Sequence, residues 1–144
     1  MLWWISILTT RYGPIVEFAG ILYTFPAMHT TRYHLIVDVS HANAAISDPE
    51  AIRTFLINMA AATDMSVLAG PLVAEGIPEN PGITGFVIVD FSHVSVHTFT
   101  KYGEAMIDVF SCRKYDPEKV RALCRKTFGT NGSELREKLV WWGE

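Results

Sequence analysis

The chain has 144 residues, of which 49% are hydrophobic and 19% are charged, and its formal net charge is −3. This length and composition are typical of one folded domain with a sizeable core, and they exclude a disordered chain. No run of lysine and arginine marks a basic face, so nucleic acid is not an expected partner. The two cysteines, Cys112 and Cys124, form no CxxC pair and no disulfide framework, which favours a reducing cytoplasm. Each cysteine can also serve simply as a small, buried hydrophobic residue.

The first 27 residues are predicted to be an added N-terminal segment or an unused upstream start, because Met28 lies four residues before the first clear strand. The apolar run MLWWISILTT is about half as long as a membrane span. It has neither the basic region nor the small-residue cleavage site of a signal peptide. The next apolar run contains Glu17 and Pro26. We therefore expect no membrane segment and place one domain at residues 28–144.

The first clear elements are a strand followed by a helix. Residues 32–40 (RYHLIVDVS) are rich in β-branched and aromatic residues, which predicts a strand. Ser47 and Glu50 have the spacing of a capping box, and Pro49 suits a first helical turn. The predicted helix carries an apolar stripe at helical spacing. Its members are Ile52, Phe55, Leu56, Met59 and Ala60.

More strand patterns follow this helix. Residues 65–70 (MSVLAG) predict a short strand, and the Gly/Pro-rich stretch 70–82 predicts a loop or an edge segment. Residues 83–99 have a long strand-like character. After the interruption KYGE, residues 105–112 (AMIDVFSC) alternate between two faces and predict another strand.

The last part of the chain is predicted to be helical. Residues 115–129 (YDPEKVRALCRKTFG) predict a helix that Asp116 caps, with Pro117 in its first turn and Gly129 at its end. Residues 133–142 (SELREKLVWW) predict a short C-terminal helix. This order of elements favours an α+β fold, a two-layer sandwich of an antiparallel sheet with helices on one face. A homodimer or the extra N-terminal residues would then cover the other face.

The stretch FSHVSVHTF (residues 91–99) places a serine and two histidines in a strand-like sequence. They fit an ordinary structural role, on the solvent face or as a hydrogen-bonded core histidine. A metal site is not expected, because His93 and His97 would lie about 13 Å apart on a strand. A Ser-His-acid triad is not expected either. The chain has no GxSxG motif, and Ser92 and His97 fall on opposite faces of an unbroken strand.

A serine inside a strand can also attack the carbonyl group that precedes it. Removal of the α-proton then eliminates the resulting ester, the upstream chain leaves as a carboxylate, and the serine becomes an N-terminal pyruvoyl group. That ketone condenses with a substrate amine and acts as an electron sink. Such a site needs an oxyanion donor, a histidine base and a proton donor.

The residues around this serine resemble the prokaryotic S-adenosylmethionine decarboxylases. The family pattern reads approximately GvTG, ESHiSiHTwPE and aDvFtCG. The chain has GITG at 82–85, SHVSVHTF at 92–99 and DVFSC at 108–112, with the same spacings. RYHLIVDV at 32–39 is similar to the family's first strand, GRHLilDl. The resemblance covers about residues 28–129.

This resemblance implies a pyruvoyl-dependent decarboxylase of polyamine biosynthesis that cleaves itself between Phe91 and Ser92. By resemblance, Ser92 would become the pyruvoyl group and His97 would be the base that drives the elimination. Thr84 would be the processing hydroxyl, and Cys112 would be the proton donor after decarboxylation. The pyruvoyl group would be the cofactor, without a metal, and the expected partners are a small-molecule substrate and a second copy of the chain.

Three residues depart from the family pattern. Phe91 stands where the family has glutamate, and Arg113 stands where a small residue is usual. Lys101 replaces the acidic residue that holds the ribose hydroxyls, and an ammonium group accepts no hydrogen bond. The added positive charge disfavours the cationic S-adenosylmethionine. Two alternatives therefore stay open: the same chemistry on arginine or ornithine, met by Glu104 or Asp90, or an unprocessed, inactive homologue that binds a partner subunit.

Overall fold

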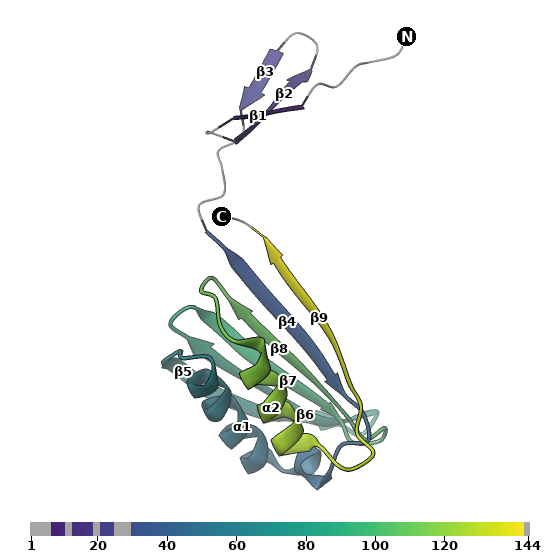
Figure 1. The fold of residues 1–144 in the computed structure, drawn as a ribbon. Coiled ribbons are helices and arrows are strands. Elements are labelled where there is room, and N and C mark those ends of the chain that lie inside the picture. Colours follow the sequence, from purple (N-terminus) through teal and green to yellow (C-terminus); the bar gives the residue numbers. More distant parts are fainter. Residues whose placement is uncertain (1–6, 11–12, 19–20, 25–29, 143–144) are drawn as a thin grey trace, which may run out of the picture. The chain divides into compact units, whose positions relative to one another are not determined.

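The computed structural model describes residues 7–10, 13–18, 21–24 and 30–142, and the chain divides into two compact units. The first unit contains three antiparallel strands in the order β1-β2-β3. They are β1 (Ile7–Thr10), β2 (Gly13–Phe18) and β3 (Ile21–Thr24). The second unit is Arg32–Trp142 (Figure 1). The predicted start at Met28 lies outside the described residues.

The second unit is an antiparallel six-stranded sheet with two α-helices, as the α+β prediction required. The strand order is β5-β6-β7-β8-β4-β9. The strands are β4 (Arg32–Val39), β5 (Val67–Ile77), β6 (Asn80–Val89), β7 (Ser92–Phe99), β8 (Glu104–Ser111) and β9 (Leu135–Trp142). The helices are a short 3-10 turn η1 (Ala44–Ser47), α1 (Pro49–Ala62) and α2 (Pro117–Phe128).

Both α-helices cover the same face of this sheet (Figure 1), and the core lies between the two layers. The whole apolar stripe predicted for α1 is buried. Strand alternation supplies the other half of the core. In β7, for example, Val94, Val96 and Thr98 are buried and the residues between them are partly exposed. The predicted two-layer sandwich is therefore confirmed.

The helix caps are set by short acidic side chains. Asp48 caps α1 by accepting a hydrogen bond from the backbone N–H of Glu50 at 2.9 Å. The predicted cap at Ser47 is wrong, because Ser47 belongs to η1. Pro49 occupies the first turn of α1 as predicted. For α2, the predicted cap at Asp116 is confirmed.

Two predicted stretches form the edge strands of the sheet, and the C-terminal one differs from the prediction. The predicted C-terminal helix is wrong, because residues 135–142 form β9 and pair with β4 along its whole length. Pairing with an unfilled sheet edge outweighed the local helix propensity of this segment. Residues 70–77 of the Gly/Pro-rich stretch continue the predicted short strand as the edge strand β5, in agreement with the expected edge segment, and its register shifts tolerate glycine and proline.

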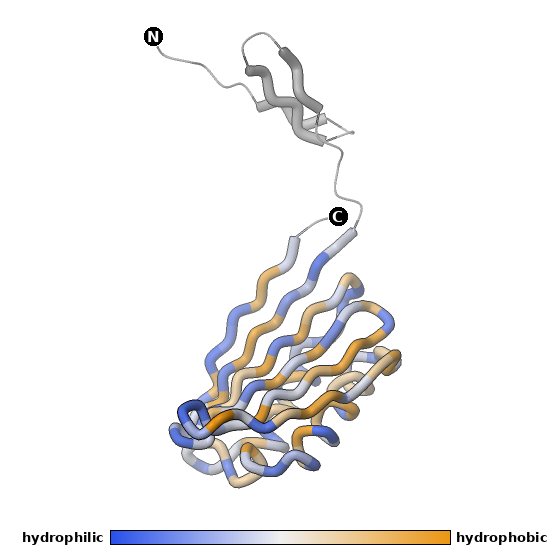
Figure 2. Tube along the Cα trace, turned by 180° about the vertical axis from the view of Figure 1, so that it is seen from behind, coloured by the Kyte–Doolittle hydropathy of each residue, from blue (hydrophilic) through white to orange (hydrophobic). Residues whose placement is uncertain are grey.

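The second face of the sheet carries no helix within this unit (Figure 2). A row of rings crosses it from β6 to β9, with neighbouring ring centroids 5.2 to 6.2 Å apart. The ring-bearing residues are Phe86, His93, Phe110, His34 and Trp142. Leu72 and Met106 on the same face are 71% and 41% exposed. We call this surface the open face.

Candidate active site

The long strand-like stretch 83–99 is broken by a tight turn at Asp90 and Phe91, which joins β6 to β7. Two hydrogen bonds to Ser66 hold the turn. The Asp90 backbone N–H donates to the Ser66 carbonyl at 3.0 Å, and the Ser66 N–H donates to the Asp90 carboxylate at 3.1 Å. The expectation of an unbroken strand is therefore wrong. The break lies at the bond that the family pattern marks for cleavage.

The carbonyl oxygen of Phe91 is bound by Cys112. The Cys112 backbone N–H donates to it at 3.0 Å, and the Cys112 thiol lies at 3.5 Å from the same oxygen. A backbone donor fixed on a carbonyl oxygen stabilises the negative charge that develops there when the carbon is attacked. Cys112 and the Phe91–Ser92 bond are thus brought together, although 21 residues separate them in sequence.

Ser92 has a backbone φ of 143°, a region that non-glycine residues rarely adopt. The region is avoided because it turns the Cβ atom of an L-residue toward the preceding carbonyl carbon. That closeness is also what a serine hydroxyl requires to close a five-membered ring on this carbon. At an ordinary strand φ, Cβ points away from the carbonyl carbon and the ring cannot close. The backbone of Ser92 is thus arranged for attack on Phe91.

His93 is the side chain that touches the Ser92 hydroxyl. Its Nδ1 lies 3.1 Å from the Ser92 Oγ. The imidazole ring is stacked between Phe86 and Phe110, at centroid distances of 5.2 and 5.5 Å. Sequence reasoning considered His93 only as a metal ligand or a solvent-face residue. Its position directly after the serine was the one available signal of this contact.

Thr84 and His97 meet each other, but they do not meet Ser92. They face each other across β6 and β7, and the Thr84 hydroxyl lies 2.6 Å from the His97 Nδ1. His97 is five residues along β7 from Ser92, which corresponds to roughly 16 Å. The ring of Phe99 packs edge-on against His97 at 4.5 Å. The four predicted site residues therefore form two groups at opposite ends of the strand.

A family model matches the part of the chain that contains these residues. The model described as "S-adenosylmethionine decarboxylase" matches residues 33–138. The chain belongs to the S-adenosylmethionine decarboxylase family. The enzymes of this family are pyruvoyl-dependent carboxy-lyases. The resemblance predicted from the motifs is thereby confirmed.

Individual relatives agree with this assignment. The S-adenosylmethionine decarboxylase proenzyme of Pyrococcus furiosus is 38% identical over 95 residues, which are 64% of this chain and 66% of the relative. The proenzyme of Clostridium botulinum strain Hall is 29% identical over 114 residues, which are 78% of this chain and 96% of the relative. The match thus spans just under two thirds of the Pyrococcus protein and nearly all of the Clostridium protein.

A solved structure has the same fold. The crystal structure of the adenosylmethionine decarboxylase from Aquifex aeolicus superposes with a TM-score of 0.61 at 23% identity, covering 76% of this chain and 90% of that chain. At this identity the likeness concerns the fold.

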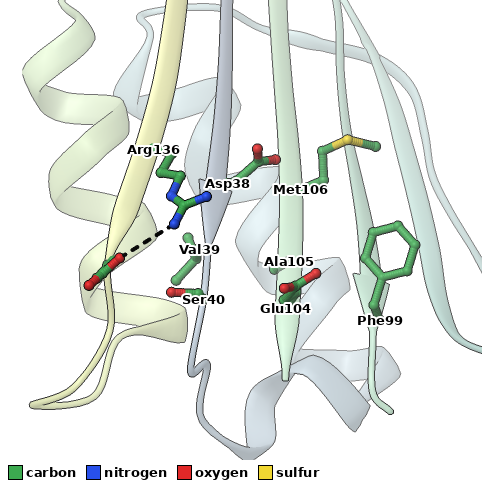
Figure 3. Close-up of a pocket in the computed structure, with 9 residues that line it drawn as sticks. Asp38, Val39, Ser40, Phe99, Glu104, Ala105, Met106 and Arg136 are labelled. Atoms are coloured by element: carbon green, nitrogen blue, oxygen red, sulfur yellow. Dashed lines mark ion pairs between the residues drawn. The ribbon is translucent and has the colours of Figure 1, made fainter. Parts of the chain in front are cut away.

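A pocket of about 320 Å³ lies at the His97 end of the sheet (Figure 3). Its walls come from β4, β7, β8 and β9. They include Asp38, Phe99, Glu104, Met106 and Arg136. Arg136 forms an ion pair with Glu134 at 3.8 Å. The carboxylates of Asp38 and Glu104 have no ion pair among the described residues. The Glu104 side chain that sequence reasoning singled out for a cationic substrate thus lines this pocket, whereas Asp90 lies in the turn beside Ser92.

The three residues that depart from the family pattern lie in two places. The Arg113 guanidinium stacks on the Phe91 ring at 4.2 Å and also donates to the Asp64 carbonyl. Two of the departures therefore contact each other beside the Phe91–Ser92 bond. Lys101 is exposed in the turn after β7, with its ammonium group 5.6 Å from the Tyr102 ring.

The two cysteines differ in burial and therefore in the chemistry open to their thiols. The other cysteine, Cys124, is fully buried as expected for a small hydrophobic residue, and burial raises the pKa of its thiol to about 12. Of the two cysteines, Cys112 is the exposed one.

In the part of the chain that the structure describes, no cluster of three metal-ligating side chains occurs. None of the helices described is long and apolar enough to cross a membrane.

Proposed function

We propose that this chain is the proenzyme of a pyruvoyl-dependent decarboxylase that cleaves itself between Phe91 and Ser92. The observation that carries the proposal is the conformation of this bond. Ser92 holds a φ of 143°, which turns its Cβ toward the Phe91 carbonyl carbon, and the oxygen of that carbonyl accepts a backbone hydrogen bond from Cys112. A strained serine beside a prepared oxyanion site serves no evident purpose in a structural hairpin.

The proposed cleavage proceeds in balanced steps. The Ser92 Oγ attacks the Phe91 carbonyl carbon, the C–N bond breaks, and an ester with a free amine forms. A base removes the α-proton of Ser92, and the Phe91 carboxylate leaves from Cβ. The resulting enamine tautomerises to an imine, and water hydrolyses the imine to the pyruvoyl ketone and ammonia. When formed, this ketone condenses with a substrate amine and accepts the electrons that decarboxylation releases.

The proposed roles divide between two copies of the chain. Cys112 lies beside the future pyruvoyl group and is placed to return a proton after decarboxylation. Thr84 and His97 lie roughly 16 Å away within one copy. In such a dimer the open faces of the two copies pack against each other. A two-fold axis that runs across the strands would then place the His97 end of one copy against the Ser92 end of the other. The exposed ring row on the open face supports this homodimer.

The proposed substrate is an amino acid that carries a cationic group. In the proposed homodimer, the pocket with Asp38 and Glu104 faces the Ser92 of the other copy, and its carboxylates suit a sulfonium or a second amine. S-adenosylmethionine is the substrate named for the relatives. Lys101 offers no acceptor for a ribose, so the same chemistry on arginine or ornithine is the second candidate.

Intact-mass analysis of the purified chain tests the cleavage. We expect two fragments, 1–91 and 92–144, with the second fragment carrying a ketone at its N-terminus. Ser92→Ala is expected to fold and stay uncleaved, because alanine has no nucleophile for the acyl shift. A wild-type chain that remains intact would instead support the inactive, partner-binding homologue. Cleavage of Ser92→Ala at the same bond would contradict the proposed mechanism.

A further inference from the structure

The first step of the proposed cleavage requires a base for the Ser92 hydroxyl. A serine hydroxyl is a weak nucleophile until a neighbouring group accepts its proton. A general base must lie within about 2.6–3.2 Å of the oxygen that carries the proton. Within one copy the His97 imidazole lies roughly 16 Å along the strand. His97 of a second copy is proposed for the later removal of the α-proton. Cys112 is directed at the Phe91 carbonyl oxygen.

We propose that His93 is a catalytic residue of self-cleavage, the base that takes the Ser92 hydroxyl proton in the acyl shift. The inference rests on the proposed self-cleavage and assigns a step that the family resemblance leaves without a base. The His93 Nδ1 lies 3.1 Å from the Ser92 Oγ, within the distance for direct proton transfer. In the tautomer with hydrogen on Nε2, Nδ1 accepts the hydroxyl proton.

The surroundings of His93 hold this contact in place. Phe86 on β6 and Phe110 on β8 stack on the two faces of the imidazole, with interplanar angles of 25° and 28°. A ring stacked on both sides cannot swing away from the hydroxyl without losing both contacts. Positioning of this kind makes proton transfer effective at a fixed distance.

The proton is returned in the same step. His93 Nδ1 accepts the Oγ proton as Oγ bonds to the Phe91 carbonyl carbon, which forms the five-membered ring. When the C–N bond breaks, His93 gives this proton to the Ser92 nitrogen, which leaves as a free amine. His93 is then neutral again. The later α-proton removal is a separate event, for which His97 of the second copy remains the proposed base.

His93 is therefore proposed to act while the ester forms, and His97 after it has formed. Treatment with hydroxylamine distinguishes these two roles. Hydroxylamine at neutral pH cleaves an ester at Phe91–Ser92 but leaves the peptide bonds intact, including Asn131–Gly132, which it attacks only at alkaline pH. We expect His97→Ala to accumulate the ester and to release fragment 1–91 with hydroxylamine. His93→Phe keeps the three-ring stack but has no base, and we expect it to stay intact with and without hydroxylamine. Its rate of ester formation should fall about 10²–10⁴-fold, the usual contribution of a general base.

A thiol nucleophile provides the second variant. A cysteine thiol ionises near pH 8.5 without help, so Ser92→Cys combined with His93→Phe should form a hydroxylamine-sensitive thioester at pH 8.5. This rescue would exclude a merely structural role for His93. The Ser92→Cys variant alone is the matched control.

Three results would overturn the role of His93. They are splitting of His93→Phe at the wild-type rate, an accumulated ester in His93→Phe, and failure of the double variant to form the thioester that Ser92→Cys forms alone. A wild-type chain that never splits would overturn the proposed function itself. That result is distinguishable because it appears before any histidine is changed.

Discussion

At the scale of single residues, the site combines groups kept from the family pattern with groups that replace it. Cys112 lies beside the Phe91–Ser92 bond, where the proposed cleavage occurs. Phe91 and Arg113 replace family residues, and the Arg113 guanidinium stacks on the Phe91 ring. A cation over an aromatic ring contributes about 0.5–2 kcal/mol. The contact of Arg113 with Phe91 therefore offsets part of the energetic cost of replacing the family's glutamate with Phe91.

Cys112→Ala is expected to separate self-cleavage from turnover. The backbone N–H that binds the Phe91 carbonyl is kept in this variant, so the chain should still split. Without the thiol, the product carbanion lacks its proton donor. We expect most product formation to be lost, measured as released amine per cleaved chain. Full turnover in Cys112→Ala would contradict the role of this thiol as proton donor.

Lys101→Glu is expected to improve the handling of S-adenosylmethionine. An unpaired ribose hydroxyl in a built site costs about 1–3 kcal/mol, which corresponds to about 5–150-fold in affinity. The measurement is decarboxylation of S-adenosylmethionine, arginine, ornithine and lysine by the wild type and the variant. Efficient turnover of S-adenosylmethionine by the wild type would mean that another residue holds the ribose.

At the scale of elements, two glycines of the GITG motif allow close packing. A Cβ at Gly85 would lie 2.8 Å from side-chain atoms of both Ile52 and Leu56, so β6 and α1 approach closely at this position. A Cβ at Gly82 would lie on the Thr98 carbonyl of β7. The motif that identified the family thus also keeps β6 in register with its neighbours.

Gly85→Ala is expected to destabilise the chain through this contact. Overpacking of a core by one methyl group costs about 1–3 kcal/mol, because α1 must shift or change rotamers. The measurement is the free energy of unfolding in denaturant, made in the Ser92→Ala background so that every chain is intact. Gly132→Ala is the matched control, since its nearest atom is 4.0 Å away. Equal losses in the two variants would contradict the packing explanation.

At the scale of the whole molecule, the proposed processing groups lie apart within a single copy. The Ser92–Cys112 group and the Thr84–His97 group lie at opposite ends of β7. The open face between them carries large exposed apolar side chains, including Phe86 and Met106. A second copy bound to this face would complete the site and cover the apolar surface at the same time.

Co-expression of two inactive variants tests this arrangement. Ser92→Ala has no nucleophile, and His97→Ala lacks the proposed elimination base, so neither should split by itself. In a mixed dimer, the His97→Ala copy receives His97 from its partner, and we expect that copy to be cleaved. Mass analysis distinguishes the two chains. Absence of cleavage in a verified mixed dimer would place His97 and Ser92 in the same copy.

The sequence by itself determined the features that depend on neighbours along the chain. The apolar stripe of α1, the Asp116 cap and the alternation of β8 follow from local periodicity and short-range hydrogen bonds, and the motif spacing indicated the family. Tertiary structure alone decided the features that depend on distant pairing. Residues 135–142 became a strand because β4 offered an open edge. The contact between Cys112 and Phe91, the φ of Ser92 and the separation of His97 from Ser92 all follow from where the hairpin turns, and a pattern of alternating residues does not encode that position.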